Sequence, residues 1–396
     1  MSINDIIDIK QKNVKDIIRC VRFNDGLTKK QIAEKTGLSF STVSNICNEL
    51  KEKGVITDKN DGNYSVGRTP KVINLAYNKF FVLCLDLQLE GIIKMALLDL
   101  RNNIIFQYEN DNVDFADVYE LVNFAYSGFQ TYIKSHDISE DHIVGVGVAI
   151  SGVFDRKEGK IGSCMVPILE GQPLKKIISD VFHLPVYVDN ESNLSVLAAQ
   201  LYKAKDDYKD NVIYLYIGEG VGVGVISDGT LIRGENGYGT EIGHIPIGNM
   251  NYQCRTCHSY GCVETDLSIY GFVKKYTGRF MGRKEGVVKE WNNFICDVLD
   301  NKPEAMNVIQ ENGIILGQLV SILVNLFDPA LIYMGGVIAP IYDKLYPFII
   351  DEVKKRLLIP NDREIMIECD ENSDYTIFKG SVERLLNMWD PLFAIT

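Results

Sequence analysis

The sequence predicts an α/β protein in which a small N-terminal helical domain with a β-wing precedes two similar α/β lobes. Three observations predict this fold. Capped apolar runs at helical spacing end near residue 54, and buried-strand patterns begin at Phe80. The order of strand, hairpin and third strand that begins at Phe80 occurs again from Val212. We therefore expect domains at residues 1–79, 80–200 and 201–396, with a final helix that can pack back on the first lobe.

Composition excludes several protein classes. The chain has 396 residues, of which 46% are hydrophobic and 24% are charged, as in ordinary globular proteins and unlike disordered or collagen-like chains. The most apolar stretch, residues 313–327, is interrupted by Gln318, Ser321 and Asn325 and is too polar to span a bilayer. The first ten residues lack the basic flank of a secretory signal. We therefore expect a cytoplasmic protein with no membrane insertion.

Charge is distributed unevenly along the chain. Residues 1–80 hold 14 Lys and Arg against 9 Asp and Glu, a balance of +5, whereas the other 316 residues hold 27 against 44, a balance of −17. A basic segment on an acidic body is typical of a DNA-binding module carried by a larger protein.

Three short helices are predicted in the first domain. The first runs from about residue 13 to residue 23. Thr28 and Gln31 have the spacing of a capping box that begins the second helix, which ends at Gly37. Ser39 is the expected N-cap of the third helix. One face of that helix is predicted to be buried and carries Val43, Ile46, Cys47 and Leu50.

The break at residues 36–38 indicates a helix-turn-helix unit. The face of the third helix that lies opposite its buried face carries short polar side chains, including Asn48. Short hydrogen-bonding side chains near the start of a recognition helix suit contacts with base edges and phosphates. Strands at 55–57 and 64–66 would form a wing that leads into a basic segment at 67–71. A unit that only mediates dimerisation is the less favoured alternative. The predicted DNA-binding residues are Ser41, Thr42, Ser44, Asn45, Arg68 and Lys71.

Strand patterns fill the rest of the chain in two matching sets. The first set comprises 80–87, 92–98 and 103–107, and the second comprises 212–217, 222–226 and 231–232. Further single strands are expected at 144–150, 185–188 and 331–334. Two such lobes facing one another would form a cleft, which is the default place for a ligand.

One group of cysteines has the spacing of a metal site. Cys254 and Cys257 form a Cys-x-x-Cys pair, Cys262 follows after four residues, and His244 precedes the pair by ten. Three thiolates and one imidazole form a closed tetrahedral site of the structural Zn²⁺ type. The other six cysteines are scattered, and we expect small buried hydrophobic residues rather than disulfides.

Six segments together resemble the ROK family, which groups sugar-responsive repressors with bacterial sugar kinases. The resemblance covers nearly the whole chain and implies a two-lobed, actin-like (ribonuclease-H-like) fold behind a winged helix-turn-helix. Among the members, repressors of xylose and N-acetylglucosamine operons are the most similar. The segments are GVGVAISGVFD at 145–155, VYVDNESN at 186–193, GEGVGVGV at 218–225, NGYGTEIGHIPI at 236–247, CRTCHSYGCVE at 254–264 and NLFDPALIYMGG at 325–336.

The resemblance also allows the kinase reading to be examined. Where the kinases have Asp-x-Gly-Gly-Thr, this chain has Gln88 and Glu90 in place of small residues, and Glu219 replaces the Thr of a Gly-Thr-Gly turn. Glu191 stands at the position of the catalytic Asp. A carboxylate about 4 Å from a phosphate costs on the order of 4 kcal/mol at an effective dielectric near 20. We expect no kinase activity, and we expect the glycines at 218–224 to serve a hairpin with unusual backbone angles.

The sugar-binding positions are better preserved than the kinase positions, and the resemblance implies their roles residue by residue. The implied sugar ligands are Gly152, Asn190, Glu191, Glu241, His244 and Glu264.

The metal motif differs slightly from the family pattern. Family members show Cys-x-Cys-Gly-x-x-Gly-Cys at the metal site, whereas this chain has one extra residue between its first two cysteines. His258 then stands where the first Gly is expected, so either Cys254 or His258 could complete the site.

Together these observations predict a sugar-responsive transcriptional regulator, with repression favoured. It would act on operator DNA as a homodimer or tetramer, and a sugar effector would change lobe closure. Two alternatives remain open. The first is an ATP-dependent sugar kinase that keeps a DNA-binding head, and the second is a repressor controlled by a phosphotransferase-system protein.

Overall fold

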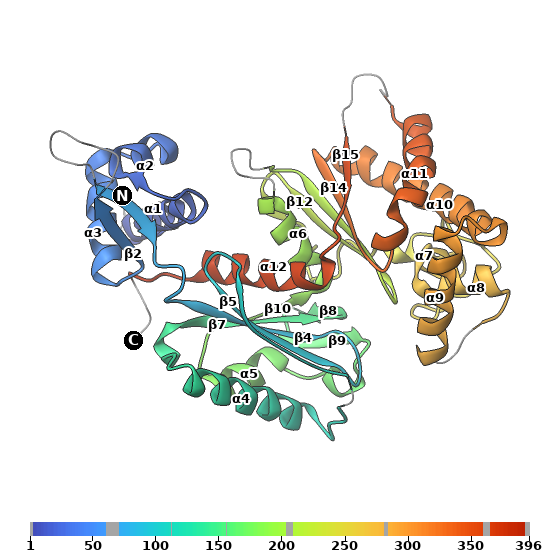
Figure 1. Cartoon of the computed structure of the whole chain (residues 1–396), viewed down its shortest axis with the longest axis horizontal. Coiled ribbons are helices and arrows are strands. Elements are labelled where there is room, and N and C mark those ends of the chain that lie inside the picture. The colour runs from blue at the N-terminus through green and yellow to red at the C-terminus, as the bar shows by residue number, and fades with distance from the viewer. Residues whose placement is uncertain are drawn as a thin grey trace. The chain divides into compact units, whose positions relative to one another are not determined.

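The computed structural model describes residues 3–60, 71–111, 113–155, 157–202, 209–280, 284–358 and 365–392 (Figure 1). The chain divides into two compact units. Unit 1 comprises Met1–Gly152, Glu158–Asp189 and Ser381–Thr396, and unit 2 comprises Val153–Lys157 and Asn190–Gly380.

The N-terminal domain, in unit 1, contains three helices and a small sheet. The helices are α1 (Ile3–Phe23), α2 (Lys29–Thr36) and α3 (Phe40–Glu52), and the strands are β1 (Leu27–Thr28), β2 (Ile56–Asn60) and β3 (Lys71–Leu75), in the order β1-β3-β2. The capping box of Thr28 and Gln31 is confirmed, and Gly37 ends α2 at φ 69°. The expected burial of Val43, Ile46, Cys47 and Leu50 is also confirmed.

Two expectations for this domain need comment. Helix α1 begins at Ile3, ten residues earlier than predicted, because Ile3, Ile7 and Val14 keep the apolar helical spacing that continues to the end of the helix. The strand that pairs with β2 is β3 at Lys71–Leu75, whereas the expected wing strand at 64–66 lies outside the described residues.

The first lobe contains a five-stranded sheet in the order β10-β7-β4-β5-β6. Its strands are β4 (Phe81–Leu87), β5 (Ile93–Asp99), β6 (Ile104–Asn110), β7 (Ile143–Ile150) and β10 (Val186–Asn190). Helices α4 (Val118–Ser135) and α5 (Leu174–Phe182) lie on one face of this sheet (Figure 1). Shorter elements are η1 (Glu140–His142), β8 (Gly152–Asp155), β9 (Lys160–Cys164) and η2 (Pro167–Leu169).

The second lobe contains a sheet in the order β13-β12-β11-β14-β15. Its strands are β11 (Val212–Ile217), β12 (Val221–Ser227), β13 (Thr230–Leu231), β14 (Leu331–Gly336) and β15 (Met366–Cys369). Around it lie α6 (Glu191–Tyr202), η3 (Ile242–His244), α7 (Glu264–Leu267), α8 (Ile269–Thr277), α9 (Lys284–Leu299), α10 (Pro303–Phe327), η4 (Ala339–Ile341) and α11 (Tyr342–Arg356).

The two sheets have the same topology. β4 pairs antiparallel with β5 and parallel with β7, and β11 pairs antiparallel with β12 and parallel with β14. The strand at one edge is β10 in the first sheet and β15 in the second. The predicted duplicated α/β fold is therefore confirmed. β15 was missing from the prediction because its four residues give too short a pattern to recognise.

The glycines of the second-lobe hairpin have a different cause from the one expected. Gly218, Gly220, Gly222 and Gly224 are absent from the positive-φ residues, so unusual backbone angles do not explain them. A Cβ at Gly222 would overlap the Ser192 hydroxyl, and one at Gly224 would overlap the Ser192 carbonyl. The prediction of strained hairpin angles was wrong, because these last two glycines allow α6 to approach β12 closely.

Two further helices shape the lobes. α10 is long and apolar enough to cross a membrane, so the expectation that this stretch is too polar was wrong. Most of its apolar window is nevertheless buried in the core of unit 2. The boundary between the units falls inside α12 (Ser373–Met388), between Gly380 and Ser381. In unit 1, a Cβ at Gly147 would overlap Ser381, so the second half of α12 lies directly on β7.

We predict that Gly224→Ala lowers the free energy of unfolding by about 1–3 kcal/mol, because the added methyl group overpacks the contact between α6 and β12. Gly128→Ala is the control. There the nearest atom is the terminal methyl of Met95 at 3.1 Å, and a helical Gly→Ala change is neutral or stabilising by about 1 kcal/mol. Urea unfolding of both variants measures the difference, and equal stabilities would contradict the close-approach explanation.

Candidate functional site

The exposed face of α3 carries the side chains that the sequence assigned to DNA contact. The Ser39 hydroxyl accepts a hydrogen bond from the Thr42 amide at 3.1 Å and so caps the helix. Ser41 and Asn45 are exposed, and Thr42 and Ser44 are half-buried. The structure thus brings four of the six predicted DNA-binding residues together on the first turns of one helix.

Two residues near this face were not predicted. Lys29, at the start of α2, donates hydrogen bonds to Asn48 Oδ1 at 2.8 Å and to Ser44 Oγ at 3.2 Å. Phe40 begins α3 and is 58% exposed, which is unusual for a large apolar side chain. A phenyl ring at this position suits apolar contact with a thymine methyl group. The basic pair Lys29-Lys30 that opens α2 could have drawn attention to Lys29.

The wing holds one of the two remaining predicted residues. Lys71 begins β3 instead of lying in a basic tail, and its Nζ is 3.0 Å from Asp58 Oδ2. Lys51 lies 2.6 Å from the other oxygen of Asp58. Hydrogen bonds from Lys51 and Lys71 lower the pKa of Asp58. Arg68 lies outside the described residues.

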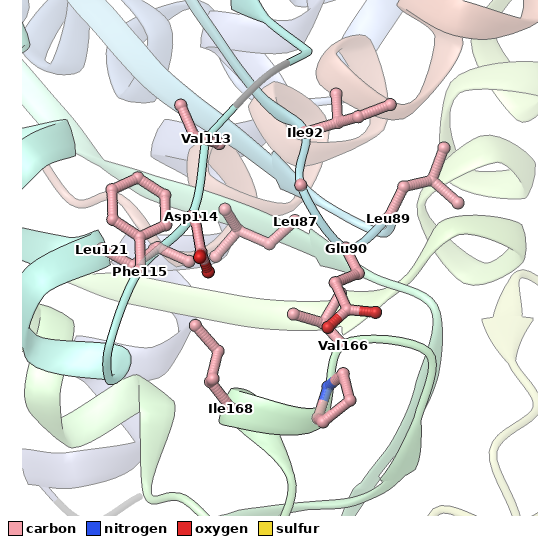
Figure 2. Close-up of a pocket in the computed structure, with 12 residues that line it drawn as sticks. Leu87, Leu89, Glu90, Ile92, Val113, Asp114, Phe115, Leu121, Val166 and Ile168 are labelled. Atoms are coloured by element: carbon pink, nitrogen blue, oxygen red, sulfur yellow. The ribbon is translucent and has the colours of Figure 1, made fainter.

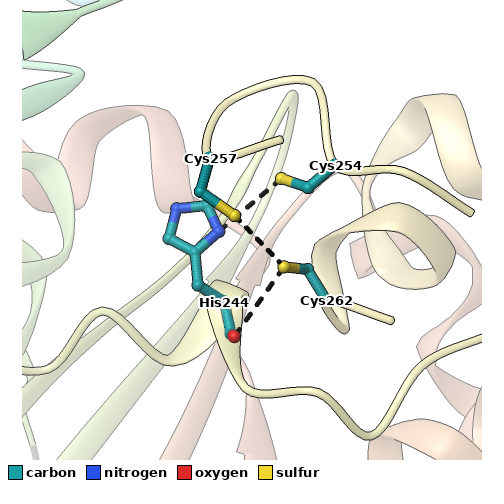
Figure 3. A group of neighbouring side chains, drawn as sticks. All are labelled: His244, Cys254, Cys257 and Cys262. Carbon is teal, nitrogen blue, oxygen red and sulfur yellow. Dashed lines mark hydrogen bonds between the residues drawn. The ribbon is translucent and has the colours of Figure 1, made fainter. Parts of the chain in front are cut away.

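Four side chains of unit 2 gather in one cluster (Figure 3): His244, Cys254, Cys257 and Cys262, whose ligand atoms all lie within 4.8 Å of one another. His244 ends η3, and the three cysteines belong to the loop that leads into α7. His244 Nδ1 lies 3.7 Å from Cys254 Sγ, and Cys257 Sγ lies 3.4 Å from Cys262 Sγ. His258 is not a member of the cluster, so the fourth position falls to Cys254.

The donor set fits a tetrahedral Zn²⁺ ion. Bond lengths of about 2.3 Å to sulfur and about 2.0–2.1 Å to nitrogen place tetrahedral ligand atoms roughly 3.6–3.8 Å apart, close to the observed spacings. Burial and the neighbouring thiols raise the pKa of Cys262 to about 12, whereas at Cys257 desolvation is outweighed by hydrogen bonds from Ser259 and Cys262, which lower its pKa to about 7. Three thiolates therefore repel one another at this spacing unless a cation lies among them.

A buried polar network fixes the base of this loop. The Asn249 amide donates to Asp266 Oδ2 at 2.7 Å, and Lys275 Nζ lies 2.8 Å from Asp266 Oδ1. Asn312 on α10 accepts from Lys275 at 2.6 Å and donates to the Asp266 carbonyl at 3.0 Å. The cysteine loop is thereby tied to the helical core by partners that lie far apart in the sequence and that no local pattern indicates.

Glu264 joins the cysteine cluster to the turn between β11 and β12, which we call the second-lobe turn. Its Oε1 lies 3.7 Å from Cys254 Sγ and accepts from Thr256 Oγ1 at 3.2 Å. Its Oε2 accepts from the backbone amide of Val221 at 3.3 Å, and a Cβ at Gly220 would lie 2.9 Å from the same oxygen. An amide of the turn that could have met a phosphate is therefore used internally.

The other predicted sugar ligands have these positions. Asn190 ends β10 and its Oδ1 accepts from the Asn193 amide at 2.8 Å, and Glu191 begins α6. Glu241 keeps an exposed surface, yet the groups packed around its carboxyl displace enough water to raise its pKa; Glu264 adds to this effect and His244 opposes it. These residues belong to unit 2. Gly152 belongs to unit 1, where φ 154° and the nearby Ser163 carbonyl exclude a side chain.

The turn between β4 and β5, at residues 88–92, lines a cavity of about 240 Å³ in unit 1 (Figure 2). Its walls are mostly apolar, and Glu90 and Asp114 turn their carboxylates toward it from the β4–β5 turn and from the segment before α4. The described residues that line it include no Lys or Arg. Two carboxylates without a counter-charge repel an anion, so this surface is unsuited to phosphate.

The second-lobe turn also carries a carboxylate of its own. Glu219 lies between Gly218 and Gly220, and its Oε2 accepts a hydrogen bond from the Tyr270 hydroxyl at 3.5 Å. The Gly218 amide donates to the Gly220 carbonyl at 2.9 Å and closes the turn on itself.

Comparisons with known proteins agree with this organisation. The model of the ROK family matches residues 120–376, and that of winged helix-turn-helix DNA-binding domains matches residues 11–57. A xylose repressor of Caldicellulosiruptor bescii is 25% identical over 397 residues, covering 96% of each chain. The crystal structure of a ROK family transcriptional regulator, a homologue of the Escherichia coli Mlc protein, has a TM-score of 0.80 at 22% identity and covers 96% of this chain and 97% of its own. A ROK hexokinase from Thermus thermophilus has a TM-score of 0.63 at 18% identity and covers 77% of this chain and 97% of its own.

We predict a pH-dependent contribution of Asp58 to stability. Because its pKa is lowered in the folded chain, the stabilisation is present above the unfolded pKa of about 3.9 and is lost as pH falls through the folded value. Asp58→Asn should therefore destabilise the protein more at pH 7 than at pH 3 in urea unfolding. Glu34→Gln removes an exposed pair with Lys30 at 3.9 Å and should change little at either pH. An equal effect of Asp58→Asn at both pH values would contradict the assignment.

Proposed function

The chain belongs to the ROK family, and from this premise we propose that it is a sugar-responsive transcriptional repressor. It binds operator DNA through the winged helix and binds a sugar or sugar derivative through Asn190, Glu191, Glu241, His244, Glu264 and Gly152. The observation that carries the proposal is a recognition helix with an exposed hydroxyl and amide face, in one chain with carboxylates, an amide and an imidazole of the kind that hold sugar hydroxyls.

The winged helix supports the DNA-binding part. Ser41 and Asn45 are exposed near the start of α3, where a recognition helix contacts base edges. Recognition helices usually act in pairs on two half-sites about one helical turn apart. We therefore infer a cytoplasmic homodimer or tetramer on a pseudo-palindromic operator. The repressor assignment is supported by the xylose repressor that is similar along nearly the whole chain.

The altered turns support a receptor without kinase activity. Glu264 accepts the Val221 amide, Glu219 lies on the same turn, and Glu90 borders the first-lobe cavity. Each carboxylate would lie where the kinases of this fold bring phosphate. Glu191 also differs from the catalytic Asp, because its longer arm moves the carboxylate oxygen. A sugar can still be held, since carboxylates and amides accept or donate to hydroxyls without needing a phosphate beside them.

A structural Zn²⁺ completes the proposal. Bound among His244, Cys254, Cys257 and Cys262, Zn²⁺ supplies the positive charge that neutralises the thiolates and ties the loop together. His244 turns Nδ1 toward Cys254 Sγ, which leaves Nε2 for the effector. Glu264 links the loop to the turn at Val221, so loop order and the placement of a sugar ligand depend on each other.

We predict that the chain binds a selected operator duplex and that one sugar in a panel of pentoses, hexoses, N-acetylhexosamines and their phosphates weakens this binding. Asn45→Ala should lower operator affinity by about 5- to 150-fold, corresponding to about 1–3 kcal/mol of lost base contact. Glu241→Gln should reduce the response to the sugar. Fluorescence anisotropy of labelled DNA measures both, with the exposed Glu235→Gln as control.

Three outcomes would contradict this proposal. Operator binding unaffected by every sugar would refute direct induction. In that case, release of DNA by a phosphotransferase-system protein would favour a protein partner. ATP-dependent phosphorylation of a sugar in a coupled assay would establish the kinase.

We predict about one Zn²⁺ per chain by elemental analysis of the full-length protein. Cys262→Ser should lose the metal and increase amide exchange in the loop that contains the three cysteines, because Zn²⁺ contributes about 10–16 kcal/mol in small zinc-finger peptides. Cys296→Ser, which alters an exposed cysteine outside the cluster, should retain the metal. Wild-type protein without metal, or a Cys262→Ser variant that keeps it, would contradict the assignment.

A further inference from the structure

A buried arginine fixes the DNA-binding domain within unit 1. Arg22 lies in the last turn of α1 and is only 5% exposed. Its Nη1 and Nη2 each lie 2.6 Å from a different carboxylate oxygen of Glu383, which is itself 7% exposed. This two-pronged geometry is the strongest and most directional form of an ion pair between side chains.

The rest of the guanidinium is satisfied by the turn between β5 and β6. Arg22 Nε donates to the Leu100 carbonyl, and Nη2 donates to Asn102 Oδ1 at 3.0 Å. Asn102 Nδ2 donates in turn to Glu383 Oε1 at 3.1 Å, which closes a ring of three side chains. Asp99 holds this turn by accepting from the backbone amide of Asn103 at 2.9 Å. Nε, Nη1 and Nη2 of Arg22 therefore each have a partner in the first lobe or on α12.

The helix that carries Glu383 packs closely on the first-lobe sheet. α12 lies on β7 at two glycines: a Cβ at Gly147 would overlap Ser381, and one at Gly145 would lie 2.9 Å from Leu385. The other half of α12, Ser373–Gly380, belongs to unit 2, which carries the proposed sugar ligands Asn190 to Glu264. One helix thus contains both the residue that holds the DNA-binding domain and a segment of the unit expected to sense the sugar.

A second contact between the same parts is weaker and provides a control. Arg101 pairs with Asp25, just after α1, and its guanidinium lies 4.5 Å from the centroid of the Tyr77 ring. The Asp25 side chain is 72% exposed, so solvent screens this pair and it adds little.

We propose that the Arg22–Glu383 pair is the element that couples the position of the DNA-binding domain to α12, and through it to the sugar; this rests on the proposed function. Two buried charges tolerate little change in spacing, because separation takes the buried Glu383 carboxylate away from its guanidinium counter-charge. A small displacement of α12 therefore breaks or makes the whole contact. Apolar side chains of similar size could shift past one another without a large energetic cost, and they would couple α12 less strongly to the DNA-binding domain. Arg22 and Glu383 are positioning residues, since they contact neither DNA nor sugar in this scheme.

The test compares Arg22→Met, Glu383→Met and the double variant in the full chain. Each single change leaves one buried charge unpaired, and the amides of the β5–β6 turn should exchange about tenfold or more faster with deuterium. The double variant replaces the pair with apolar side chains of similar length, and its stability should recover. Asp25→Ala should leave the exchange rates unchanged.

Operator binding distinguishes coupling from a merely structural role. We expect the double variant to bind the selected operator within about threefold of wild type without sugar, yet to lose the sugar's effect on affinity, about tenfold in wild type for a typical coupling. A double variant that still responds like wild type would overturn the proposal. If no sugar affects wild-type binding, the proposed function itself fails, and this coupling fails with it, whereas unchanged exchange in both single variants would refute the fixed contact alone.

Discussion

Close approach of helices to strands that carry glycine is the constraint on which the rest of the structure depends. α6 reaches β12 only because Gly222 and Gly224 leave room for Ser192, and α12 reaches β7 only because Gly147 leaves room for Ser381. The first approach places Asn190 and Glu191 at the start of α6, among the proposed sugar ligands. The second places Glu383 beside Arg22. In both places the helix lies too close to the strand for a side chain on the strand glycine. The residues that these helices position are therefore held by close packing on the two sheets.

Carboxylates determine the chemistry of the second lobe. Glu264 occupies a backbone amide of the second-lobe turn and at the same time contacts a member of the cysteine cluster. One side chain thus links two features that the sequence presents as separate, the glycine turn between β11 and β12 and the cysteine cluster beside a proposed sugar ligand. The network around Asp266 holds the other end of the loop to α10. Hydrogen bonds and an ion pair therefore tie this loop to the helices of unit 2.

Local patterns were predictable from the sequence, whereas long-range contacts were not. The capping box at Thr28, the buried face of α3 and the duplicated strand order follow from spacing alone. The cysteine spacing also predicted which side chains meet, including Cys254, whose place the family pattern left open. The hairpin glycines were misinterpreted, because a glycine needed for a close approach looks the same in sequence as one needed for positive φ. No local pattern distinguishes Arg22 from other basic residues at helix ends, because its partner Glu383 lies 361 positions away.

The distribution of charge explains why the position of the DNA-binding domain matters so much. Residues 81–396 carry a balance of −17, which disfavours contact with the phosphate backbone, whereas the N-terminal residues carry a balance of +5. Within that domain, Asp58 already pairs with Lys51 and Lys71, which reduces the charge available for non-specific binding. On the proposed function, affinity then depends largely on short side chains on α3 and on two domains that bind one operator together, with Arg68 as a further predicted basic contact. Such binding is sensitive to domain position, because hydrogen bonds from serine and asparagine fail within an ångström of misplacement, whereas lysine contacts would tolerate it. A buried attachment at Arg22 suits a DNA-binding domain whose contacts depend on its position in this way.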